Sequence, residues 1–176
     1  MQFMLLLPDL FLMRLMKIEC TTTIIKIYSM KWKLINDNKP KIYALILDSG
    51  DDVTSSLQSF AKDKQLSAAQ FTAIGAFSEV TLGFFSFKTK DYKKIEVNEQ
   101  VEVLVLTGDI SLYKNEPKLH AHVVVGKEDG TAHGGHLLKA KTHPTLEIII
   151  TESPSYLKRE IDKETGLALI AIDQSH

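Results

Sequence analysis

The strongest constraint on the fold is a series of short apolar segments that recurs between residues 40 and 173. These segments are rich in Val, Ile, Leu and Phe, and turn residues such as Gly, Asn or Asp separate most of them. Their lengths and alternation are typical of β-strands. They cover residues 41–47, 70–74, 79–87, 101–107, 119–125, 146–151 and 167–172.

One segment has a different period. Val53, Leu57 and Phe60 recur at helical spacing, directly after Asp51 and Asp52. Either aspartate can cap the helix by accepting from its first free N–H groups. One early helix among six or seven strands predicts an α+β domain with a mixed or antiparallel sheet and its helical layer on one face.

Length and charge exclude several classes of protein. The 176 residues fit one domain, and a single cysteine excludes a disulfide scaffold or a multi-cysteine zinc ribbon. It fits a reducing compartment, and we expect a cytoplasmic protein. Residues 40–176 hold 15 basic and 19 acidic side chains, a net charge of −4. Direct binding of nucleic acid through bulk electrostatics is therefore not expected.

The N-terminal 39 residues are interpreted as an appendage, followed by one domain over 40–173 and a tail over 174–176. Pro8, Asp9 and Arg14 interrupt the apolar run of the first 16 residues, so no membrane span is predicted. A signal peptide is not predicted either, because the basic leading region is missing. Two interpretations stay open: an amphipathic or disordered appendage, or an over-long gene start with the true start at Met30.

Histidines carry the main chemical signal. His120 and His122 occupy alternate positions of a predicted strand, so their side chains project from one face. A turn follows at residues 128–130, and His136 comes after Gly134 and Gly135. A chain reversal would bring His136 beside the first pair. Three imidazoles with an open fourth position are typical of catalytic zinc sites.

The alternative interpretation of this cluster is a set of partly buried, hydrogen-bonded histidines without metal. His133 stands apart, because its side chain could face solvent instead of the site. His143 precedes Pro144 and is assigned to a turn, and His176 is terminal.

Other chemistries have weaker support. Cys20 lies in the N-terminal segment, and the chain contains no GxSxG, GxxxxGK[ST] or GxGxxG motif. Glu79 and Glu147 are candidate carboxylates near the site, either as a general base or as hydrogen-bonded structural acids.

Several motifs in order resemble the PPC domain, the plants and prokaryotes conserved domain also called DUF296. The resemblance covers residues 40–173, and its motifs are SGDD (49–52), AIGAFSEVTLGFF (73–85), HAHVVVG (120–126), DG (129–130), GGHL (134–137) and PSY (154–156).

The resemblance implies a compact domain with a largely antiparallel, strongly curved sheet and a few flanking helices, assembled as a homotrimer. It also implies metal binding by the family's histidine motif, which His120, His122 and His136 match. In plants the domain accompanies AT-hook DNA-binding motifs. This chain lacks the Arg-Gly-Arg-Pro core of an AT-hook, so direct DNA binding is not carried over.

Three functions stay open at this point. The leading hypothesis is a homotrimer that binds a divalent metal, zinc in particular, and acts as a ligand-binding or regulatory assembly module. The second is a metal-dependent enzyme on a small substrate, for which no specific activity is assigned. The third is a transcription-associated protein that reaches DNA through a partner.

Overall fold

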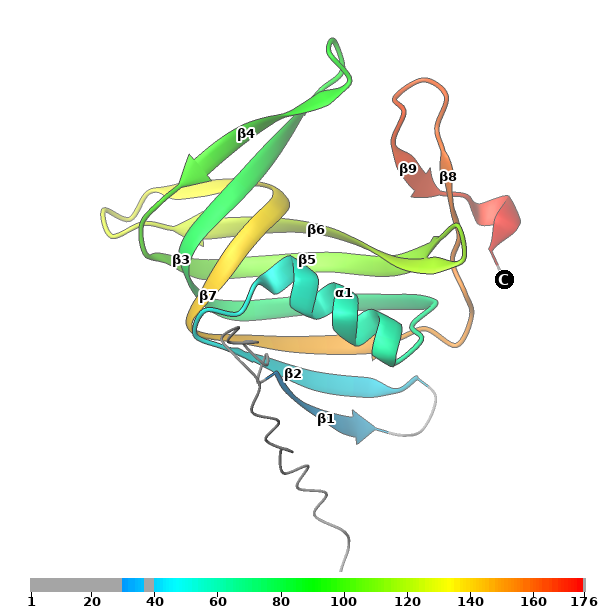
Figure 1. The fold of residues 1–176 in the computed structure, drawn as a ribbon, viewed down its shortest axis with the longest axis horizontal. Coiled ribbons are helices and arrows are strands. Elements are labelled where there is room, and N and C mark those ends of the chain that lie inside the picture. Colours follow the sequence, from blue (N-terminus) through cyan, green and yellow to red (C-terminus); the bar gives the residue numbers. More distant parts are fainter. Residues whose placement is uncertain (1–29, 37–39, 176) are drawn as a thin grey trace, which may run out of the picture.

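A computed structural model describes residues 30–36 and 40–175 of the chain (Figure 1). Its strands are β1 (Lys31–Asn36), β2 (Ile42–Asp48), β3 (Ala68–Ser86), β4 (Asp91–Val97), β5 (Val101–Tyr113), β6 (Glu116–Gly126), β7 (Ala132–Glu152), β8 (Arg159–Ile161) and β9 (Ala168–Ile170). The helices are α1 (Val53–Asp63) and a short 3-10 turn, η1 (Ile172–Gln174). The predicted α+β class is confirmed.

Seven strands form one antiparallel sheet in the order β1-β2-β7-β6-β5-β3-β4. The strands β3 and β7 also pair with each other, so the sheet curves until β3, β5, β6 and β7 close a ring. The segments 70–74 and 79–87, predicted as two strands, form the single long strand β3. Gly75 permits one of its register shifts, because its φ is +149° and a Cβ there would collide with the carbonyl oxygen of Thr145.

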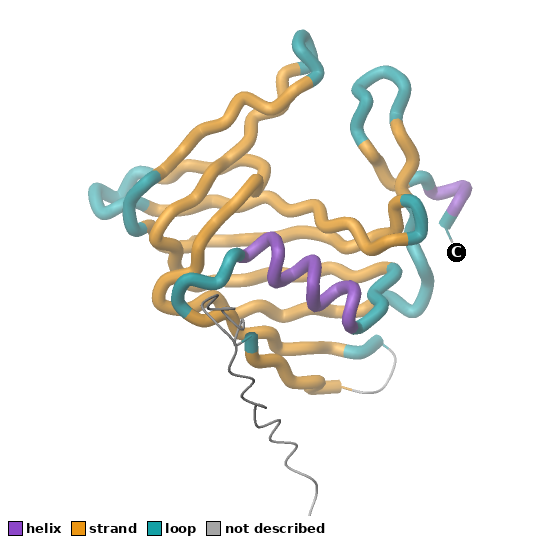
Figure 2. Tube along the Cα trace, viewed as in Figure 1, coloured by secondary structure: helices purple, strands orange, loops and turns teal. Residues whose placement is uncertain are grey.

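Helix α1 lies across the sheet and covers one of its faces (Figure 2). Its N-cap is Asp52, one of the two candidate aspartates, and its Oδ1 accepts from the backbone N–H of Ser55 at 2.9 Å. Leu57 and Phe60 are buried on its inner side, and the Phe60 ring meets the Tyr43 ring edge-on at 5.4 Å. The core therefore lies between α1 and the concave face of the sheet.

The sheet extends upstream of the expected domain start. Strand β1 pairs with β2, so Lys31–Asn36 belongs to the sheet although the sequence placed it in the appendage. The expectations for residues 1–29 and for His176 fall outside the described residues. Within the described ranges, no helix has the length and apolar character needed to cross a lipid bilayer.

The C-terminal segment forms a separate two-stranded hairpin of β8 and β9. In Figure 1 this hairpin and the tip of the β3–β4 hairpin both lie toward the top of the view. The base of the β8–β9 hairpin is attached to β5, because the N–H of Leu112 donates to the carbonyl of Leu157 at 2.7 Å. The strand that the sequence predicted over 167–172 is limited to Ala168–Ile170 in the structure. The 3-10 turn η1 follows it.

Candidate metal centre

Alternation along β6 separates a core-facing row from an outward row. Ala121, Val123 and Val125 are buried in the core. The alternate residues Lys118, His120 and His122 consequently point to the other face, because successive side chains of a strand alternate. A polar stripe of two histidines and one lysine thus runs along this outer face.

The turn after β6 brings β7 back antiparallel to β6, as the sequence predicted. His122 and His136 are direct cross-strand partners, so their side chains share a face. The GGH motif has a steric reason, since a Cβ on Gly135 would lie 2.9 Å from the carbonyl oxygen of Gly83. Only a residue without a side chain lets β7 approach β3 this closely.

The structure brings His120, His122 and His136 together. Their ring centroids lie 5.2–5.3 Å apart, and one potential ligand nitrogen from each lies within 4.8 Å of the others. Nitrogens bound to one tetrahedral zinc are about 3.4 Å apart, from bonds of about 2.1 Å. Small rotations of the rings would therefore bring the three nitrogens within bonding distance of one ion.

Two of the clustered imidazoles, those of His122 and His136, have lowered pKa values. Burial, with added repulsion from His120, His122 and Lys118, lowers the pKa of His136 to about 4. Burial and the neighbouring His120 also lower the pKa of His122. Neutral rings at pH 7 have a free lone pair, which is the form that coordinates metal.

One buried ring nitrogen of the cluster lacks a hydrogen-bond partner among the described residues. This atom is Nδ1 of His136. A buried polar atom without a partner is costly. A cation bound by the three histidines would remove such a cost, so the donor set fits a divalent metal.

Asp109 stands beside this cluster and was not singled out by the sequence. It is the cross-strand partner of His120, and its Oδ2 lies 3.5 Å from Nδ1 of His120. The distance is long for a hydrogen bond but short enough for attraction. This contact occupies Nδ1 and leaves Nε2 of His120 for a metal.

Arg159 fixes Asp109 from the C-terminal hairpin. Its Nη2 donates to Asp109 at 2.6 Å, its Nε to Ser111 at 2.6 Å, and its Nη1 to the Ala168 carbonyl at 2.7 Å. Burial alone raises the pKa of Asp109, but the interactions with His120 and Arg159 outweigh it and hold this pKa below its usual value. Asp109 is therefore a carboxylate at neutral pH.

Tyr92 closes the other side of the cluster. Its ring stacks on the His136 ring with centroids 4.8 Å apart and an angle of 29° between the planes. Tyr92 comes from β4, so four strands contribute to the site: β4, β5, β6 and β7.

Other sequence candidates lie outside the cluster. His133 is exposed and pairs with Val125, so it points away from the His136 face. His143 was assigned to a turn, but it lies within β7, where its Nδ1 is 3.0 Å from the hydroxyl oxygen of Ser49. The structure therefore places both outside the three clustered histidines.

The two glutamates proposed as site carboxylates are not buried. Glu79 forms an ion pair with Lys141 at 3.6 Å, and Glu147 is exposed on β7. Neither belongs to a metal-competent group among the described residues. Glu79 is half-exposed and Glu147 is exposed, so neither is placed as the carboxylate of the histidine cluster that the sequence suggested.

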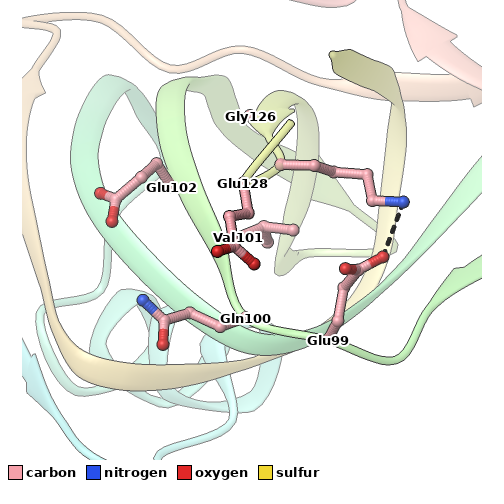
Figure 3. A pocket seen from close by; sticks show the side chains of 7 residues that line it. Glu99, Gln100, Val101, Glu102, Gly126 and Glu128 are labelled. Atoms are coloured by element: carbon pink, nitrogen blue, oxygen red, sulfur yellow. Dashed lines mark ion pairs between the residues drawn. The ribbon is translucent and has the colours of Figure 1, made fainter. Parts of the chain in front are cut away.

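A hollow of about 460 Å³ lies at the turns that join β4 to β5 and β6 to β7 (Figure 3). Glu99, Glu102 and Glu128 line it, with Glu99 paired to Lys127 at 2.7 Å. It is acidic and separate from the histidines. Its charge makes it unsuitable for a phosphate group.

The curved antiparallel sheet, the single covering helix and the outer-face histidine triad define a compact α+β domain with a candidate metal centre. The chain belongs to the family of Plants and Prokaryotes Conserved (PCC) domains, whose profile matches residues 35–154. The predicted family resemblance is confirmed. The comparison with curated proteins finds no significant match.

Solved structures from three prokaryotes are similar to this one. A Bacteroides thetaiotaomicron protein, whose name suggests DNA binding, is 30% identical with a TM-score of 0.77, over 82% of this chain and 99% of that one. A metal-containing protein of Archaeoglobus fulgidus is 30% identical with a TM-score of 0.69, over 84% and 99%. A plant- and prokaryote-conserved protein of Pyrococcus horikoshii is 27% identical with a TM-score of 0.70, over 85% and 97%.

Proposed function

We propose that this protein binds one divalent metal ion per chain through His120, His122 and His136. Zinc is the first candidate for this ion. The observation that carries the proposal is the convergence of three ring nitrogens within 4.8 Å on one sheet face. The neutral state of His136 and its unpartnered Nδ1 support it. So does the metal content of the Archaeoglobus relative.

Three protein ligands leave a fourth position open on a tetrahedral ion. The protein would therefore act as a metal-centred module that takes a small ligand at the open position. The test is elemental analysis of protein purified without added metal, followed by zinc titration of the chelator-treated protein. One ion per chain supports the proposal, and less than about 0.1 per chain after titration contradicts it.

We also propose that the chain assembles as a homotrimer. Apolar side chains are exposed on the outer face of the sheet beside the histidines, where Val105 on β5 is directly opposite Val124 on β6. The exposed fractions are 61% for Ile74, 55% for Leu104, 40% for Val105, 36% for Val124 and 43% for Ile149. Such a patch is typical of a protein interface.

Light scattering tests the assembly directly. A trimer has three times the chain mass of 19.8 kDa. Val124→Lys places a charge in the patch and should shift the measured mass toward that of a single chain. Lys139→Gln changes an exposed residue of β7 and should leave the mass unchanged. A parent mass of one chain would contradict the trimer.

Direct DNA binding is not part of the proposal, although the name of the Bacteroides relative suggests that activity. Residues 40–176 carry a net charge of −4, and the hollow between the turns is acidic. Phosphate contacts need excess Lys and Arg. An association with DNA would therefore run through a partner, and a salt-sensitive shift of duplex DNA by the purified protein would contradict this view.

A further inference from the structure

A pocket of about 330 Å³ opens beside the histidine cluster, lined by Tyr92 of β4 and by residues of the β8–β9 hairpin. His120 and His136 form part of its wall, so it reaches the candidate metal position. The hairpin that closes it lies beyond residue 154, where the family match ends. The pocket is therefore built partly from residues that follow the profile match.

The charge of this pocket is positive. Among the described residues that line it, none is acidic, and the charged ones are Lys118 and Arg159. The three donating nitrogens of Arg159 are taken by Asp109, Ser111 and Ala168. Lys118 is different, because its ammonium only lies over the Tyr113 ring, 5.4 Å from the centroid, and makes no ion pair with the described residues.

Lys118 is placed to act together with a metal. It precedes His120 by two residues on the same face of β6, a distance of about 7 Å along the strand. Its charge contributes to the lowered pKa of His136. An anion in the pocket would thus meet an available ammonium on one side and the metal position on the other.

The remaining walls are apolar or aromatic. Leu119 of β6 lies on one side, and Ile161, Leu167 and Leu169 of the hairpin segment lie on the other. Tyr92 and Tyr113 add ring surface. Such walls favour a ligand with an apolar body and one charged group.

We propose that this pocket binds a small organic monocarboxylate, with its carboxylate between Lys118 and the metal and its apolar body against the β8–β9 hairpin. This inference rests on the proposed metal function, because the metal supplies the second positive charge. A phosphate ester is a poorer fit, since it carries more charge and needs more donors than one ammonium offers.

The test uses 4-fluorobenzoate as the probe and ligand-observed fluorine NMR on the zinc-loaded full chain. The parent should bind the probe, and the neutral 4-fluorobenzamide should bind at least about tenfold more weakly, as expected for loss of a charge-assisted contact. Lys118→Gln should weaken 4-fluorobenzoate about tenfold with zinc content unchanged. Lys114→Gln is the matched control, because Lys114 also lies over Tyr113, at 5.3 Å, but does not line the pocket.

A second pair of variants tests the hairpin wall. Leu169→Glu adds a negative charge to the pocket and should abolish binding of the probe. Ile172→Glu adds the same charge to a 73% exposed residue outside the pocket and should leave binding unchanged. These two variants leave Lys118 unchanged, so they test the hairpin wall separately from the contact of Lys118 with the carboxylate.

The outcomes separate the two proposals. Zinc-loaded parent protein that fails to bind 4-fluorobenzoate, or equal binding by parent and Lys118→Gln, overturns the pocket inference and leaves the metal function intact. Failure to load zinc overturns the metal function, and probe binding that is the same with and without zinc overturns the metal's role in the pocket. Inorganic phosphate that displaces the probe better than acetate does would overturn the carboxylate class.

Discussion

Nδ1 of His120 lies 3.5 Å from Oδ2 of Asp109, its direct partner on the neighbouring strand. The contact sets which nitrogen of His120 faces the cluster, and Asp109 is in turn held by Arg159 from the C-terminal hairpin. A segment that follows the profile match thus acts, through Asp109, on one ring of the histidine cluster.

Asp109→Asn should weaken zinc binding about 10- to 100-fold, because the carboxylate that orients His120 is lost. The dissociation constant is measured by competition with a chelator. Glu102→Gln is the control, since Glu102 is exposed on the same strand and touches no histidine. Equal affinities for the two variants would show that Asp109 does not position His120.

Arg159→Met should lower the free energy of unfolding by about 2–3 kcal/mol. The residue is only 7% exposed and its side chain donates three hydrogen bonds, and its removal leaves the partly buried Asp109 without its guanidinium partner. Arg159→Lys should recover little of this, because an ammonium cannot reproduce the planar fork. Chemical denaturation measures both, and a loss below about 0.5 kcal/mol for Arg159→Met would contradict the role of this residue.

The metal-free protein should lose stability as the pH falls from about 6.5 toward 4. The pKa of His136 is about 4 in the folded chain, below its ordinary value of 6.5. In this window the unfolded chain binds more protons than the folded chain, and acid therefore favours unfolding. Above pH 7 both states are neutral at His136 and the contribution is flat.

His136→Gln removes this titrating group, so its melting temperature should depend less steeply on pH than that of the metal-free parent. His133→Gln, at an exposed position outside the cluster, should follow the parent curve. Parallel curves for parent and His136→Gln would contradict the lowered pKa of His136.

The sequence predicted the elements whose signals are local. The helix with its Asp52 cap and the HxH strand with its returning GGH strand depend on short-range periodicity and turn chemistry, and they stand where they were expected. The convergence of the three histidines followed from one chain reversal. That reversal was visible as the turn at residues 128–130.

The remainder of the site depends on pairing between distant segments. Asp109 becomes relevant only through its register with His120, and Arg159 reaches Asp109 across 50 positions of the sequence. An acidic residue within the apolar run of β5 was the available signal for Asp109. Tyr92 lies in a lysine-rich hairpin that indicates only a solvated turn, and the pairing of β4 with β3 places it on His136.

The length of β3 and β7 was also hidden from local patterns. Register shifts near Gly75 and between Phe77 and Glu79 bend the two strands without interrupting them. Alternation read along the sequence breaks at each shift, so one long strand is read as two. The curvature that closes the sheet comes from these irregularities.

The zinc content of His122→Ala, compared with that of the parent and of His143→Ala, tests the central claim most directly. His122 is one of the three clustered histidines, whereas His143 contacts Ser49 outside the cluster. All three proteins are purified identically, and metal content and melting temperature are measured on the same samples. We predict about one zinc per chain in the parent and in His143→Ala, and a strong loss in His122→Ala. Equal metal content in His122→Ala and the parent, or no metal in the parent with only a stability loss in His122→Ala, would contradict the assignment.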